Sequence, residues 1–163
     1  MPRKPIIAVV GSGSEIEPAV SNARALGKLI AENGWILISG GRDAGVMKAA
    51  NEGAKDIEGS LTIGILPNPD AIVSPAVDVA IVTDMGQARN NIIVLSADVV
   101  IACGVDGAGT ASEVSIAIKS ATPVILVEAS DEAKRFFEKI GGNHIHLAGS
   151  PDEAFSIAHR LLR

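Results

Sequence analysis

Arg89 is the residue whose type and position point most directly to an anion. It lies near the start of a helix expected at residues 88–97, and residues 90–97 carry no charge. A cation at a helix N-terminus is unfavourable unless it meets an anion, because the free backbone N–H groups there already carry positive partial charge. That anion is either a ligand or a neighbouring carboxylate such as Asp84 or Glu113. Both interpretations remain open from the sequence.

Glu113 also has two roles that its spacing allows. Residues 107–110 read Gly-Ala-Gly-Thr and open a helix expected at residues 110–121. The hydroxyl of Thr110 either caps this helix or reaches a phosphate oxygen beside the free N–H groups. Glu113, three residues on, either completes a capping box with Thr110 or faces the ligand as a carboxylate. From spacing alone the capping box is favoured.

Three glycine-rich loops supply backbone that could hold such an anion. They are residues 11–14 (Gly-Ser-Gly-Ser), 40–45 (Gly-Gly-Arg-Asp-Ala-Gly) and 104–110 (Gly-Val-Asp-Gly-Ala-Gly-Thr). Glycine lets backbone N–H groups come close to a phosphate and adopt positive φ. Ordinary tight turns also select Gly and Ser without any ligand. Arg42, in the second loop, has the same two interpretations as Arg89.

Two common nucleotide-binding motifs are absent from the first loop. The dinucleotide fingerprint requires a third glycine where Ile16 stands, and no Gly-Lys-Ser/Thr follows for a Walker A loop. NAD(P) redox chemistry and ATP hydrolysis are therefore disfavoured. The three histidines match no zinc-binding spacing, so we expect no metal ligands.

Short apolar runs rich in β-branched residues predict the strands that position these loops. Such runs are typical of parallel strands covered on both faces by helices. We expect strands at residues 6–10, 35–38, 61–66, 99–103 and 124–127, with weaker ones at 77–82 and 144–147. Periodicity and capping signals predict helices at residues 18–32, 47–57, 88–97, 110–121 and 131–140, and a last helix opened by Ser150-Pro151.

This alternation predicts a single α/β domain over residues 1–163. Its sheet is expected to be doubly wound, mostly parallel and Rossmann-like, in a three-layer arrangement with helices on both faces. Ligands of such folds bind beyond the carboxyl ends of the strands, which is where all three glycine loops fall. We therefore expect one site there for a phosphate-bearing small molecule.

The composition argues against several other classes of function. The net charge is -5, aromatic residues make up 2% of the chain and no basic block occurs, so we expect no nucleic-acid partner. No apolar run approaches the ~20 residues that span a bilayer, so we expect no membrane partner. The lone Cys103 and a start, residues 1–4, that does not read as a signal peptide predict a cytoplasmic location.

The helices expected at residues 88–97 and 110–121 are poor in charge for surface helices. Only three charged residues lie between Arg89 and Lys119. This pattern predicts a homo-oligomer, a dimer or a tetramer, packed through these helices. Burial of the helices under loops of the same chain is the alternative.

Three motifs together resemble the superfamily that contains the LONELY GUY phosphoribohydrolases, once misnamed lysine decarboxylases. They lie at residues 39–47 (Ser-Gly-Gly, then Gly-Val-Met), 85–90 (Met-Gly-Gln-Ala-Arg-Asn) and 107–113 (Gly-Ala-Gly-Thr-Ala-Ser-Glu). The likeness runs from the first strand to the helix after Glu113. Within the superfamily the chain is most similar to the molybdenum cofactor carrier proteins, through the Met-Gly-x-Ala-Arg-Asn form and the short single-domain length.

This resemblance implies a homo-oligomer that binds the molybdenum cofactor (molybdopterin) and protects it without turnover, with molybdenum enzymes as possible acceptors. It also implies that the terminal phosphate of the cofactor lies on residues 107–110. The cofactor-binding residues expected from the loops and motifs are Gly11, Ser12, Gly13, Ser14, Gly40, Gly41, Arg42, Met85, Arg89, Gly104, Asp106, Gly107, Ala108, Gly109, Thr110 and Glu113.

The enzyme branch of the superfamily implies an alternative, cleavage of the N-glycosidic bond of a nucleoside 5′-monophosphate. Its acting arginine and glutamate correspond to Arg89 and Glu113, which would be catalytic only in that case. Two departures from the enzyme pattern argue against it. Asp106 stands at or beside a glycine of the phosphate loop and would repel a phosphate dianion unless it turns away or meets a cation. Asn90 stands where the enzymes have lysine.

Overall fold

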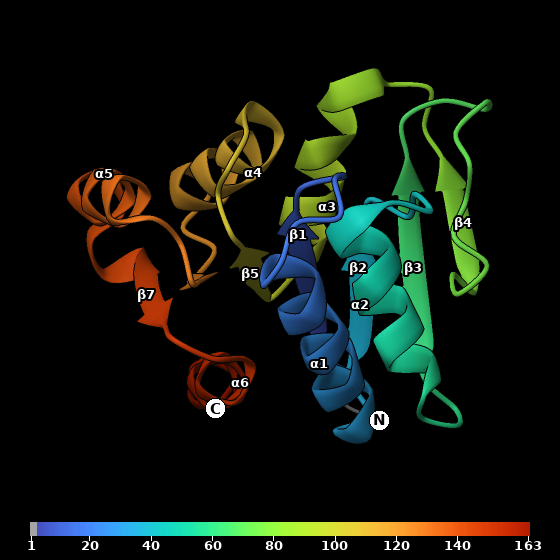
Figure 1. The fold of residues 1–163 in the computed structure, drawn as a ribbon, viewed down its shortest axis with the longest axis horizontal. Coiled ribbons are helices and arrows are strands. Elements are labelled where there is room, and N and C mark those ends of the chain that lie inside the picture. The colour runs from blue at the N-terminus through green and yellow to red at the C-terminus, as the bar shows by residue number, and fades with distance from the viewer. Residues whose placement is uncertain (1–2) are drawn as a thin grey trace.

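One sheet of seven parallel strands forms the centre of the computed structural model, which describes residues 3–163 (Figure 1). The strand order is β4-β3-β2-β1-β5-β6-β7. The predicted fold class is confirmed, and the sheet is parallel at every pairing rather than mostly parallel. The strands are β1 Ile6–Gly11, β2 Ile36–Ser39, β3 Leu61–Leu66, β4 Val79–Val82, β5 Val99–Cys103, β6 Val124–Val127 and β7 Ile145–Ala148. Residues 1 and 2 of the expected non-signal segment lie outside the described residues.

Helices cover both faces of the sheet. One face packs against α1 (Ala19–Glu32), α2 (Gly45–Lys55) and α6 (Pro151–Leu161); the other packs against α3 (Asn90–Ser96), α4 (Ala108–Lys119) and α5 (Asp131–Gly141). In β1, Ile7 and Val9 belong to the first core, and Ala8 and Val10 belong to the second. Because both sides of a strand are buried in this way, its sequence is continuously apolar rather than alternating.

The predicted order of strands and helices is confirmed, and the differences lie at element ends. Ser130 and Ser150 accept hydrogen bonds from backbone N–H groups three residues on, as expected for N-caps. The helix expected at residues 88–97 is instead a short 3-10 helix, η1 (Gly86–Arg89), followed by α3. A second 3-10 turn, η2 (Gly142–His144), precedes β7. No helix within residues 3–163 is long and apolar enough to cross a bilayer.

The backbones of α1 and α2 touch directly, and the two helices run side by side in Figure 1. A Cβ atom on Gly27 would lie 1.9 Å from the carbonyl oxygen of Ala50, and one on Gly53 would lie 1.9 Å from that of Arg24. Only glycine permits this approach, so the two helices form one tightly packed unit.

Replacing Gly27 with alanine is expected to lower the free energy of unfolding by about 2 kcal/mol, because the new methyl group must push the two backbones apart. Urea denaturation followed by circular dichroism measures the change. Gly149→Ala is the matched control, since the nearest atom to a Cβ there is a Glu153 carboxylate oxygen at 3.6 Å. Equal stability of the two variants would contradict the prediction.

The carboxyl ends of the strands meet at one rim of the sheet, and chain order reverses there between β1 and β5. The connection from β3 to β4 folds over the second glycine loop at this rim. The N–H of Asp43 donates to the carbonyl of Ile72 (3.0 Å), and the N–H of Ser74 donates to the carbonyl of Gly41 (2.9 Å). The switch point in strand order is where ligands of open parallel sheets bind.

Candidate ligand-binding site

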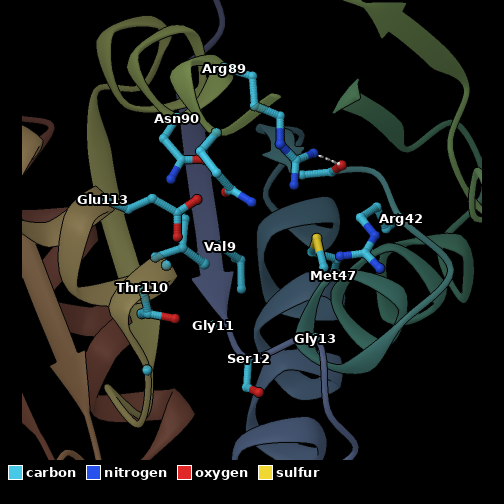
Figure 2. A pocket seen from close by; sticks show the side chains of 15 residues that line it. Val9, Gly11, Ser12, Gly13, Arg42, Met47, Arg89, Asn90, Thr110 and Glu113 are labelled. Atoms are coloured by element: carbon cyan, nitrogen blue, oxygen red, sulfur yellow. Dashed lines mark hydrogen bonds between the residues drawn. The ribbon is translucent and has the colours of Figure 1, made fainter. Parts of the chain in front are cut away.

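A cavity of about 230 Å³, here called the rim cavity, lies at this switch point. In Figure 2, Thr110 and Glu113 lie on its α4 side, and Arg42 and Met47 lie across from them. Ten of the predicted site residues line it: Gly11, Ser12, Gly13, Gly40, Arg42, Arg89, Gly107, Gly109, Thr110 and Glu113. Six others do not line it: Ser14, Gly41, Met85, Gly104, Asp106 and Ala108. Contact of any of them with a ligand stays a prediction.

The start of α4 provides free hydrogen-bond donors to the rim cavity. Gly107 is the N-cap, and within residues 3–163 no acceptor takes the backbone N–H groups of Ala108, Gly109 or Thr110. The hydroxyl of Thr110 also makes no hydrogen bond with the described residues, although this residue is buried. Unpaired N–H groups at the positive end of a helix dipole favour a bound anion.

The second glycine loop differs from the expectation that all three loops offer free N–H groups. Its Gly41 N–H donates to the Ser39 hydroxyl (3.1 Å), and its Asp43 N–H donates to Ile72 as described above. Both donors are occupied within the protein, the first by the end of β2 and the second by the β3–β4 connection. The second loop therefore shapes the wall of the cavity more than it supplies donors.

The first loop likewise serves the fold. The Ser12 carbonyl accepts the N–H of Val46 (3.0 Å) at the start of α2, and the Ser12 hydroxyl accepts the N–H of Ser14 (3.0 Å). Gly45 lies so close beneath this loop that a Cβ would be 2.3 Å from the Ser12 carbonyl oxygen. The first loop thus caps α2, and Gly45 of the second loop allows that contact.

Arg89 is buried beside the rim cavity with only 7% of its surface exposed. Its Nη1 donates to the carbonyl oxygens of Gly40 and Ile65, which fixes the guanidinium at the ends of β2 and β3. Figure 2 shows the guanidinium beside the cavity. Among the described residues it forms no ion pair with Asp84 or Glu113, so that interpretation was wrong. Burial lowers the pKa of this guanidinium, and the nearby charge of Glu113 acts in the opposite direction.

Donors of Arg89 remain unused. Its Nε is buried without a hydrogen-bond partner among residues 3–163, and its Nη2 makes no hydrogen bond there either. Leaving buried donors of a cation unpaired costs free energy, so an anion that reaches Nη2 would gain a charge-assisted bond. This is the strongest single indication that the rim cavity holds an anion.

Gly40 gives Arg89 the space it occupies. A Cβ on Gly40 would lie 2.5 Å from the sulfur of Met47 and 3.0 Å from Nη2 of Arg89. Gly40→Ala is therefore expected to displace the guanidinium and to weaken binding of an anionic ligand about fivefold, roughly 1 kcal/mol. Equilibrium dialysis measures the affinity. Gly149→Ala serves as a control outside the cavity, since the nearest atom to its Cβ would be a Glu153 carboxylate oxygen at 3.6 Å.

Glu113 points into the rim cavity, and its carboxylate makes no hydrogen bond with the described residues. The favoured capping box with Thr110 was therefore wrong: α4 begins at Ala108, which places Thr110 inside the first turn rather than at the cap. Burial raises the pKa of the Glu113 carboxyl to about 7, although the positive charge of Arg89 opposes this.

Five lining residues were missing from the predicted set: Val9, Val10, Met47, Gln87 and Asn90. Gln87, Asn90 and Met47 lie within the motifs that carried the resemblance, which was a signal available in the sequence. The Asn90 side chain donates to the Ser112 hydroxyl (3.0 Å) and so ties α3 to α4 beside the cavity. Asp106 is exposed and does not line the cavity.

Residues 4–155 match the SLOG cluster4 family model. The chain belongs to this family. An uncharacterized protein of Archaeoglobus fulgidus is 43% identical over 128 residues, which are 75% of this chain and 83% of that protein.

Two solved structures show the same fold as this SLOG cluster4 chain over its whole length. A molybdenum cofactor binding protein from Rippkaea orientalis has a TM-score of 0.93 and 48% identity, covering 99% of each chain. The molybdenum cofactor carrier protein of Chlamydomonas reinhardtii has a TM-score of 0.93 and 45% identity, covering 98% of this chain and 99% of that chain. The likeness to molybdenum cofactor carrier proteins predicted from the motifs is confirmed.

Proposed function

We propose that this protein binds the molybdenum cofactor and holds it as a carrier or store without chemical turnover. Two structural relatives bear the names of a molybdenum cofactor binding protein and a molybdenum cofactor carrier protein, and the likeness extends over 98% or more of this chain. The observation that carries the proposal is the buried Arg89, whose unused donors lie at the same cavity as the free N–H groups at the start of α4. Together they suit the terminal phosphate of the cofactor.

The partners of the protein are part of this proposal. Molybdenum enzymes would accept the cofactor from it in the cytoplasm. A second copy of the chain would pack on α3 and α4, giving a dimer or a tetramer. Leu95 on α3 is 61% exposed, and an apolar side chain so placed suits a subunit contact. Sedimentation velocity tests the assembly, and a monomer at micromolar concentration would refute it.

Transfer of the cofactor is the direct test of the carrier role. Protein loaded with molybdenum cofactor is mixed with a molybdenum-free apo-enzyme, and the recovered enzyme activity is measured. We expect activity to appear with loaded protein and not with unloaded protein. A wild-type protein that shows no affinity for the cofactor would refute the proposal.

A nucleotide phosphoribohydrolase is the second candidate, because Arg89 and Glu113 line the same cavity. Its test is incubation with purine and pyrimidine 5′-monophosphates, followed by chromatography for free base and ribose 5-phosphate. The carrier proposal predicts no release. Release that disappears in Glu113→Ala would establish the enzyme instead.

A further inference from the structure

A second cavity of about 590 Å³, here called the side cavity, opens next to the rim cavity. Arg42 and Gln87 line both of them. The two cavities are therefore neighbours with common walls.

The walls of the side cavity are held together by backbone hydrogen bonds. It lies between the second glycine loop, the start of the β3–β4 connection and η1. The Asp43 N–H donates to the Ile72 carbonyl (3.0 Å), which joins the first two segments. The Gly86 N–H donates to the Pro67 carbonyl (2.9 Å), which joins the last two. The side cavity is thus shaped by the chain itself.

The two cavities differ in chemistry. The side cavity has apolar surfaces from Pro67, Ala71 and Ile72, and the Ile72 side chain is 75% exposed to solvent. Its carboxylates are Asp70 and Asp43, of which Asp43 pairs with Lys48 at 3.9 Å, and its lining cation is Arg42. Carboxylate oxygens accept hydrogen bonds from N–H donors, and the charge of Asp70 disfavours a phosphate nearby. The free N–H groups of α4 and the donors of Arg89 lie only at the rim cavity.

We propose that the side cavity binds the pterin end of the ligand, two fused nitrogen-containing rings with ring N–H and amino donors, while the phosphate end lies in the rim cavity. The ring would cover Ile72 and donate hydrogen bonds to the carboxylates of Asp43 or Asp70. This orientation rests on the proposed function, because it takes the ligand to be the phosphate-bearing pterin cofactor.

Binding of separate fragments tests the assignment. The probes are 6-hydroxymethylpterin, followed by its intrinsic fluorescence, inorganic phosphate, followed by calorimetry, and the intact molybdenum cofactor. Ile72→Ser and Asp70→Asn are each expected to weaken pterin binding five- to tenfold and to leave phosphate binding unchanged. Arg89→Ala is expected to weaken phosphate binding and to leave pterin binding unchanged. Ile140→Ser, another exposed isoleucine on α5, is the matched control and should change neither.

The outcomes separate this inference from the carrier function. Intact cofactor that binds equally to wild type and Ile72→Ser would overturn the side-cavity assignment and leave the carrier role standing. Pterin that binds as expected while the intact cofactor does not would refute the carrier role alone. Competition between phosphate and pterin for one site, or no pterin binding to wild type at millimolar concentration, would also overturn the assignment.

Discussion

Replacing Arg89 with alanine is expected to weaken binding of the molybdenum cofactor by about 1.5–3 kcal/mol, a ten- to hundredfold loss or slightly more. The reason is the position of the guanidinium, which is buried, fixed by the Gly40 and Ile65 carbonyls and left with donors for an anion. Its removal takes away a charge-assisted bond that bulk water cannot replace at so buried a position. Equilibrium dialysis against the cofactor measures the loss.

Two further variants show whether the loss comes from the bidentate guanidinium. Arg89→Lys keeps the charge but cannot donate to two carbonyls and a phosphate in one plane, so it should recover only part of the affinity. Arg135→Ala removes an exposed arginine on α5 and should have no effect. If Arg89→Ala bound the molybdenum cofactor as tightly as the wild-type protein, Arg89 would have a purely structural role.

Glu113→Gln is expected to stabilise the unliganded protein at pH 8 by on the order of 3 kcal/mol, and by much less at pH 5. The pKa of the Glu113 carboxyl is about 7 in the folded protein against 4.5 for an ordinary glutamate. Between these two values the folded state holds a proton that the unfolded state has lost, so stability falls as pH rises through this window. Glutamine cannot ionise, so the free energy of unfolding of the variant does not fall in this pH range for this reason. Urea denaturation at both pH values measures the difference.

The same carboxylate should make anion binding dependent on pH. Above pH 7 Glu113 is charged and repels a phosphate in the rim cavity, while Arg89 and Arg42 are the cations that face it. We therefore expect inorganic phosphate to bind more tightly at pH 6 than at pH 8 after correction for its own ionisation. Glu113→Gln should remove this dependence, whereas Glu138→Gln on the exposed side of α5 should keep it. The same pH dependence in both variants would refute the role of Glu113.

Most of the fold could be predicted from the sequence because the central strands are buried on both faces. Continuous apolar runs marked β1, β2, β3, β5 and β6, and the serine caps marked the starts of α5 and α6. The two edge strands gave weaker signals, and every residue of β4 is exposed. The helix around Arg89 was misjudged because apolar periodicity does not distinguish a 3-10 turn from the first turn of an α-helix. The close approach of α1 and α2 was also beyond prediction, since a glycine within a helix does not show what lies against it.

The candidate site was predictable in its residues and less so in their roles. Glycine-rich turns at strand ends located the rim, and ten of the expected residues do line the cavity. Spacing alone favoured a capping box for Glu113, because it could not show that α4 starts at Ala108. Nor could it show that the Asp43 N–H of the second loop donates to Ile72 in the β3–β4 connection, a contact between segments about thirty residues apart.

The glycine contact between α1 and α2 has a mechanical consequence for unloading. The first two glycine loops lead into α1 and α2, which pack so closely that they move as one unit. This half of the site is therefore rigid. Residues 107–110 lead into α4, which packs on the opposite face of the sheet from this pair. Under the proposed carrier role, a partner that displaced α4 would move these residues relative to the other two loops, whereas a force on the helix pair would move both of its loops together.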